Sequence, residues 1–278
     1  MLNAFDYLKA ALSAVNEVVR DTIEEQKKKA ATSPVFTAQY EVSPPVREHT
    51  YDPFPYEEYV DPVRNYVSPE EYSELPQDKR EEVALHHYTY AEKHRNKSNE
   101  EIGRDYERFI AYQYTRMGYH VNPRGILRGK GDGGIDLIAQ KRNETLLIQC
   151  KYWGRGKVIY ENVVEQLEGS CRVYRLKHQH EGEQISPMLI TNITLDPVAR
   201  QTAELLHISY REKCFLTDYP LVKCCTFYGE RGQDVKLYFL PFDEVYDYVN
   251  IESKDVSYAF SVAEAVYRGF RRDCDGRT

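Results

Sequence analysis

Three polar side chains, Asp136, Gln149 and Lys151, interrupt two otherwise apolar segments that lie close together in the sequence. The segments IDLIAQK and TLLIQCKYW are separated only by residues 142–144, a pattern typical of a β-hairpin. The residue types at the far end of this hairpin are those that could bind a metal and support hydrolysis.

A hairpin in which Arg142 pairs with Thr145 would place Asp136 directly opposite Lys151. Directly opposed side chains share one face of a sheet, with Cβ atoms about 5 Å apart. Gln149 lies two residues before Lys151 and therefore shares that face. We expect a carboxylate, an amide and an ammonium group to converge at one end of the hairpin.

A carboxylate beside an amide oxygen suits Mg²⁺, which takes few protein ligands and retains several waters. A neighbouring lysine could orient or deprotonate a metal-bound water, or stabilise charge on a phosphate. These groups together are suited to phosphodiester hydrolysis. The alternative is a buried ion pair between Asp136 and Lys151 that has only a structural role.

The elements around the hairpin predict an α/β fold. A capping-box pattern that starts at Ser98 begins a helix, and Gly118 ends it. Residues 158–177 and 196–206 are predicted to form helices, and residues 188–191 a short buried strand. This order predicts a mixed β-sheet flanked by helices.

Four segments between residues 103 and 169 carry a family resemblance: GRDYERFIAYQYTRMGY, GDGGIDLI, LLIQCKYW and VVEQLEG. In this order they resemble the Mrr-type branch of the PD-(D/E)xK nuclease superfamily, whose GxD motif would end at Asp136 and whose QxK motif would run from Gln149 to Lys151. The resemblance implies a restriction-endonuclease-like core, double-stranded DNA as substrate and Mg²⁺ as cofactor, with Mn²⁺ as an alternative metal.

The resemblance also implies a role for each residue of the site. Asp136 would bind the metal, Gln149 would replace an acid common in the wider superfamily, and Lys151 would be the catalytic lysine. Glu107, in the position of the family's helical glutamate, is the candidate for a further metal-binding acid, followed by Asp132. The alternatives are a solvated helix residue for Glu107 and a turn residue for Asp132.

Basic residues flank the predicted site on both sides in the sequence. The glycine-rich turn before the first strand would let the backbone approach a phosphate closely. The residues expected to contact DNA phosphates are Arg124, Arg128, Lys130, Arg155 and Lys157. The alternative is that these side chains lie in solvated loops.

The 278 residues divide into four parts by pattern. An amphipathic helix is expected at 1–33, a proline-rich acidic arm or linker at 34–97, the nuclease domain at 98–212 and a small C-terminal module at 213–278. The first helix is expected to dock on its own domain or to pair with a second copy in a homodimer.

The arm and the nuclease domain carry opposite charge. Residues 41–101 contain 15 acidic and 7 basic side chains, a net of −8, whereas residues 102–178 contain 8 acidic and 14 basic side chains, a net of +6. We therefore expect the arm to shield the basic face of the nuclease domain when DNA is absent.

The overall composition excludes other classes of protein. Mean hydropathy is −0.66, and no apolar run approaches the roughly 20 residues of a membrane span. The six cysteines form no CxxC pair, so reduced thiols are expected. With no secretory signal pattern at the N-terminus, the sequence predicts a cytoplasmic protein.

We therefore predict a Mg²⁺-dependent DNA endonuclease that restricts foreign DNA. Two alternatives stay open at this point. One is a repair or recombination nuclease that acts on branched DNA, and the other is a catalytically inactive DNA-binding or adaptor protein, since a fold does not guarantee an activity.

Overall fold

The computed structural model describes residues 60–124, 134–178, 183–229 and 233–272. Residues 62–272 lie in one compact unit, whereas residues 2–61 belong to a second unit that falls almost entirely outside the described residues. The expected helix at 1–33 therefore lies outside them. Within the described ranges, no helix is long and apolar enough to cross a membrane.

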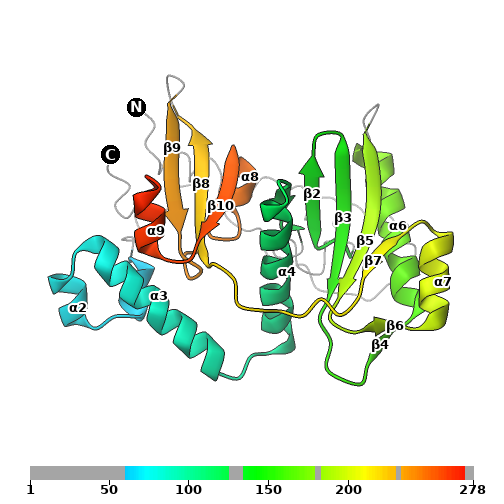
Figure 1. The fold of residues 1–278 in the computed structure, drawn as a ribbon, viewed down its shortest axis with the longest axis horizontal. Helices are drawn as coiled ribbons and strands as arrows, with labels where there is room; N and C mark the ends of the chain where they lie inside the picture. The colour runs from blue at the N-terminus through cyan, green and yellow to red at the C-terminus, as the bar shows by residue number, and fades with distance from the viewer. Residues whose placement is uncertain (1–59, 125–133, 179–182, 230–232, 273–278) are drawn as a thin grey trace, which may run out of the picture. The chain divides into compact units, whose positions relative to one another are not determined.

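A five-stranded mixed sheet forms the centre of the compact unit, in the order β1-β2-β3-β5-β7 (Figure 1). β2 runs antiparallel to both of its neighbours, β1 and β3, whereas β5 and β7 continue the sheet parallel to β3. This arrangement confirms the predicted α/β fold with a mixed sheet. The strands are β1 (His120–Asn122), β2 (Leu137–Lys141), β3 (Glu144–Lys151), β5 (Gln184–Thr191) and β7 (Ser209–Arg211).

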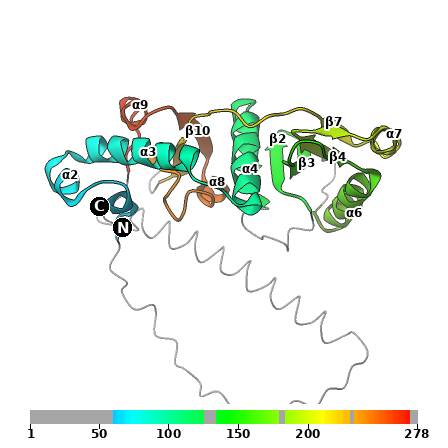
Figure 2. The ribbon, with the colours of Figure 1, turned by 90° about the horizontal axis from the view of Figure 1, so that it is seen from below.

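Helices cover both faces of this sheet (Figure 2). α4 (Asn99–Arg116) packs on one face through a core that includes Tyr106 and Ile110. α6 (Glu161–His178) and α7 (Pro197–Leu205) pack on the other face. A short parallel pair, β4 (Val158–Ile159) with β6 (Thr194–Leu195), lies beside these helices.

α4 begins where its sequence predicts. The hydroxyl of Ser98 accepts a hydrogen bond from the backbone N–H of Glu101, and the carboxylate of Glu101 accepts one from the N–H of Ser98. This reciprocal capping box satisfies two N–H groups that a helix start would otherwise leave unpaired.

A second, three-stranded antiparallel sheet follows the five-stranded sheet in the sequence, in the order β10-β8-β9. Two short helices accompany this sheet, and α9 packs on it through a separate apolar core. These elements are β8 (Val222–Tyr228), β9 (Asp234–Phe239), α8 (Val249–Glu252), β10 (Asp255–Ala259) and α9 (Val262–Tyr267).

The described part of the expected arm is largely helical, which differs from the prediction of a linker. It contains η1 (Pro62–Asn65), α2 (Pro69–Glu74) and α3 (Gln77–His94). The prolines do not prevent these helices because they lie at helix starts, where the missing N–H would be unpaired in any case.

α3 is part of the C-terminal sheet's core. Leu85 packs with Val222 and other residues of that core, and α3 contacts α9. The carboxylate of Glu81, which is fully buried, accepts a hydrogen bond from the hydroxyl of Tyr238 and forms an ion pair with Arg272. We call residues 62–95 and 222–272 together the flanking module, because the five-stranded sheet lies between these two segments in the sequence.

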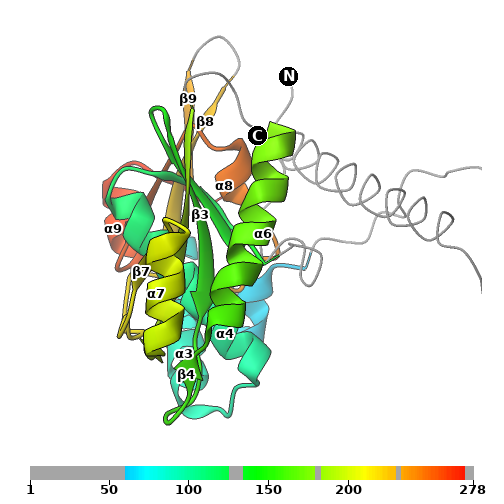
Figure 3. The same cartoon turned by 90° about the vertical axis from the view of Figure 1, so that its right-hand side faces the viewer.

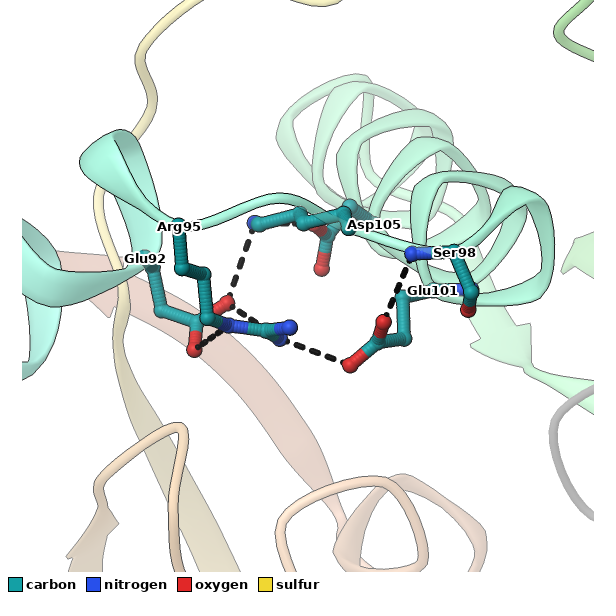
Figure 4. Close-up of polar contacts among 6 residues, drawn as sticks. Glu92, Arg95, Ser98, Glu101 and Asp105 are labelled. Atoms are coloured by element: carbon teal, nitrogen blue, oxygen red, sulfur yellow. Dashed lines mark hydrogen bonds and ion pairs between the residues drawn. The ribbon is translucent and has the colours of Figure 1, made fainter.

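Charged side chains fix the connection between α3 and α4 (Figure 4). Arg95 pairs with both Glu92 and Glu101, and Lys97 pairs with both Glu92 and Asp105. The hydrogen bond from Arg95 lowers the pKa of Glu101 to about 2. These acids of the expected arm therefore pair with neighbouring bases of the same connection. Residues 41–59 lie outside the described residues, and the shielding of the nuclease face stays a prediction.

Candidate active site at the ends of β2 and β3

The hairpin register differs from the one expected. Lys141 pairs with Glu144, so the loop contains only Arg142 and Asn143, and the expected pairing of Arg142 with Thr145 is wrong. The physical reason is the left-handed backbone of Arg142, with φ of 54°, which is typical of two-residue hairpin loops.

In the corrected register, other residues lie opposite one another across the hairpin. Each side chain stays on the face of the sheet that was expected. Leu137 pairs with Ile148, and continuing this pairing by one residue sets Asp136 opposite Gln149 rather than opposite Lys151. The shift amounts to two residues on one strand, and side chains alternate with a period of two. Gln149 and Lys151 therefore still lie on one face of β3.

Asp136 lies just before β2 and is bonded to β3 through both backbone and side chain. Its N–H donates to the carbonyl of Ile148 at 2.9 Å, and its Oδ2 accepts from the N–H of Cys150 at 2.6 Å. Asp136 is only 7% exposed, and its carboxylate contacts the β3 backbone at Cys150, between Gln149 and Lys151.

Gln149 has a fully buried side chain whose amide is unsatisfied. Among the described residues, neither its Oε1 nor its Nε2 has a hydrogen-bond partner. Gly134, with φ of +83°, approaches this amide so closely that a Cβ there would lie 3.1 Å from Nε2, with Ser170 and Gln166 of α6 next nearest. Buried amides without a partner are uncommon in proteins and costly, so this one points to a ligand or a function.

Lys151 is the last residue of β3 and is half-buried. Together with Glu107 of α4 it lies near enough to Cys150 to influence its thiol. Burial raises the pKa of the Cys150 thiol, Asp136 and Glu107 raise that pKa further, and Lys151 lowers it. Of these three charged residues, Asp136 contacts Cys150 directly, through the hydrogen bond from the Cys150 N–H.

Glu107 and Gln149 approach from opposite sides of the sheet. Cys150 belongs to the core beneath α4, the helix that carries Glu107. Gln149 alternates with Cys150 and turns toward α6. The carboxylate of Asp136 is hydrogen-bonded to the backbone of Cys150, at the strand ends between the two faces of the sheet.

The basic residues expected to bind DNA are placed only in part. Arg155 and Lys157 are exposed in the turn that follows β3, with Lys157 Nζ 5.9 Å from the ring centroid of Trp153. Arg124 is half-buried, and its guanidinium lies 5.8 Å from the ring centroid of Tyr174 on α6. Arg128, Lys130 and Asp132 lie outside the described residues.

Asn192 is a site residue that the sequence analysis missed. It directly follows β5 and is buried beside Lys151, with its amide hydrogen-bonded to the backbone of Trp153. An asparagine directly after a buried strand, next in the sheet to the QxK strand, was the available signal. Its significance depends on strand order, which the sequence pattern alone does not give.

The donor set at this end of the sheet fits a divalent metal in part. In the described part of the chain, no group of three His, Cys, Asp or Glu side chains could hold a metal ion. Gln149, which the register sets opposite Asp136, offers an amide oxygen, and its Oε1 has no hydrogen-bond partner among the described residues. Carboxylate and amide oxygens together suit a hard cation.

Residues 99–209 match the Mrr_cat family model, described as a restriction endonuclease. The match contains Glu107, Asp136, Gln149 and Lys151, and it confirms the resemblance found in the sequence. This part of the chain is similar to the restriction endonuclease family that the model describes.

Among solved structures, the chain is similar to the crystal structure of a protein of unknown function, AF1548, with 17% identity and a TM-score of 0.30. That similarity covers 40% of this chain and 60% of the other. No curated protein matches the chain.

Proposed function

We propose that the chain is a cytoplasmic, Mg²⁺-dependent endonuclease that hydrolyses phosphodiester bonds of double-stranded DNA. One observation carries the proposal: the carboxylate of Asp136 is bonded to the N–H of Cys150, between the two polar residues of the QxK motif. The family description of residues 99–209 supports the same activity.

Asp136 and Gln149 are the residues that would hold the metal, with Glu107 as a further acid and Asp132 as a second candidate. The unsatisfied amide of Gln149 supports its part in this set. When bound, the metal would polarise the scissile phosphate and lower the pKa of a water.

Lys151 would orient the attacking water and stabilise the negative charge that develops on the phosphate. An ammonium group fixed at a strand end is preorganised for this, which is the main source of electrostatic catalysis. Its half-buried position strengthens the effect, because fewer waters screen the charge there.

Exposed Arg155 and Lys157 would contact the DNA backbone, together with Arg124, Arg128 and Lys130. Contacts of this kind set affinity rather than sequence preference. Each neutralised phosphate contributes to the salt dependence, so DNA affinity should fall steeply as salt is raised.

The test is plasmid nicking by the purified protein in Mg²⁺, Mn²⁺ or EDTA, beside Asp136→Ala and Lys151→Ala. We expect nicking by the wild type in either metal, and none in EDTA or with either variant. Equal inactivity of all three proteins under conditions where they still bind DNA would overturn the proposal.

We propose restriction of foreign DNA as the biological role, on the support of the family description. The substrates that test it are methylated and unmethylated linear duplexes beside a Holliday junction. Preference for linear duplex is expected, and preference for the junction would contradict the proposed role.

A further inference from the structure

Asn192 binds the backbone of Trp153 through both ends of its amide. Its Oδ1 accepts a hydrogen bond from the N–H of Trp153 at 2.8 Å, and its Nδ2 donates to the carbonyl of the same residue at 2.8 Å. We call this pair of bonds the Asn192 clamp. It joins the chain that leaves β3 to the chain that leaves β5.

The clamp is built on a rigid base. Thr191 directly precedes Asn192, is fully buried and is paired with Lys151 across the parallel β3–β5 ladder. The carbonyl of Thr191 accepts from the N–H of Cys214 at 2.9 Å, and its hydroxyl accepts from the N–H of Ile193 at 3.3 Å. Asn192 is therefore fixed from its own strand and from the segment that follows β7.

Beyond Lys151 the chain is no longer paired with β5 as a β-strand. β3 ends at Lys151, and its partner β5 ends at Thr191. Trp153 lies two residues beyond Lys151 and two residues before the exposed Arg155. The clamp therefore acts midway between the lysine and the basic turn.

We propose that Asn192 is a positioning residue, which fixes Lys151 relative to the Asp136 carboxylate by holding the backbone of Trp153. This role rests on the proposed nuclease function. Preorganised groups lose much of their effect when they shift by about 1 Å, which can reduce a rate by about 100-fold. Loss of the clamp should therefore slow cleavage although Asn192 itself touches no substrate.

Only an amide can make both bonds of the clamp. In Asn192→Asp the carboxylate could still accept from the N–H of Trp153, but it cannot donate to the carbonyl. In Asn192→Ala both bonds are lost. Both variants should therefore cleave more slowly than the wild type.

Asn250 offers a matched control in the flanking module. It too is a buried asparagine, and its Nδ2 donates to a backbone carbonyl, that of Val121, at 3.1 Å. Asn250→Asp loses this donor just as Asn192→Asp does. Asn250 is far from Lys151 in the sequence and does not belong to the strand ends that carry the site.

The experiment measures single-turnover cleavage in Mg²⁺, DNA affinity in EDTA, melting temperature and tryptophan emission for the wild type and these variants. Trp153 is the only tryptophan, so its emission reports on the clamp directly. We expect Asn192→Ala to cleave about 100-fold more slowly with DNA affinity within about threefold of wild type, and to shift the emission of Trp153. Asn250→Asp should lower the melting temperature and leave the cleavage rate and the emission unchanged.

Three results would overturn the role. Asn192→Ala that cleaves at the wild-type rate removes the positioning role alone, and so does a rate loss no larger than that of Asn250→Asp. A wild-type protein that cleaves no DNA in either metal removes the proposed function and this role with it.

Discussion

One buried ion-pair cluster of the flanking module and the buried amide of Gln149 in the five-stranded sheet have opposite surroundings. In the flanking module, the buried Glu81, Arg272 and Asp243 form a chain of ion pairs, and Tyr238 donates to one of its carboxylates. At the ends of β2 and β3, the buried amide of Gln149 has no partner among the described residues. The ion-pair cluster buries each charge beside an opposite charge. At the ends of β2 and β3, by contrast, the amide of Gln149 is buried without a partner among the described residues.

Paired buried charges and an unpaired buried amide affect a protein in different ways. Paired charges in an interior fix one arrangement of elements, although they add little net stability over apolar residues of similar size. A buried amide with neither its donor nor its acceptor satisfied costs stability, by about 1–3 kcal/mol for each unsatisfied group. The comparison is consistent with a structural role for the ion-pair cluster and with the proposed chemical role for Gln149.

Lys151→Ala should have a large effect on cleavage, a loss of about 1,000-fold, because it removes a preorganised positive charge from the site. DNA affinity and melting temperature should change little. The matched control is Lys141→Ala at the opposite end of the hairpin, where the ammonium donates to the carbonyl of Met117. A Lys151 variant that cuts as fast as the Lys141 variant would contradict the assignment.

Asp247→Ala should have the largest effect on stability. Its carboxylate pairs in a two-bond arrangement with Arg108 of α4, and both side chains are largely buried. Removing one member leaves a buried charge unpaired, which costs about 3–5 kcal/mol. Urea denaturation measures this loss, and replacing both residues with apolar ones should recover much of it. A loss below about 1 kcal/mol would show that solvent reaches the pair.

Lys223 should give the module a characteristic pH dependence. Burial lowers the pKa of its ammonium from 10.5 to about 8, although Asp247 and Cys225 act to raise that pKa and Arg108 to lower it. Between these two pH values the unfolded chain binds more protons than the folded protein, so this group makes stability rise with pH. Lys223→Met should therefore gain stability relative to wild type as pH falls from 10.5 to 8. A difference between the two proteins that stays constant across this window would show that Lys223 titrates normally.

Ser98→Ala should have the smallest effect. It removes the side-chain half of the α4 capping box and should cost about 1 kcal/mol. Ser68→Ala, which breaks the same kind of capping box on the short helix α2, is the comparison. Because α4 carries Glu107 and supports the sheet, Ser98→Ala should lower the melting temperature more than Ser68→Ala, and the reverse order would contradict this account.

The sequence predicts the local parts of the fold well. The capping box at Ser98, the hairpin and the helices near 161–178 and 197–205 all follow from short-range patterns. The hairpin register was predicted wrongly, because the left-handed conformation of Arg142 shortens the loop and residue type alone did not indicate it.

The non-local parts could not be predicted in this way. Arg272 and Glu81 are 191 positions apart, and neither has a sequence neighbour that indicates the other. The same holds for Asn192, whose importance depends on β5 lying beside β3. Contacts of this kind follow from how the elements pack, which periodicity and composition do not specify.

Gln149→Leu tests the central claim most directly, because leucine has a similar size and no polar atoms. Thermal unfolding and plasmid cleavage in Mg²⁺ are measured on the same preparation. We predict that the variant is more stable than wild type, by about 1–3 kcal/mol, and that it no longer cleaves DNA. A variant that is less stable and still cleaves at the wild-type rate would show that the amide serves the fold rather than the chemistry, and would contradict the account.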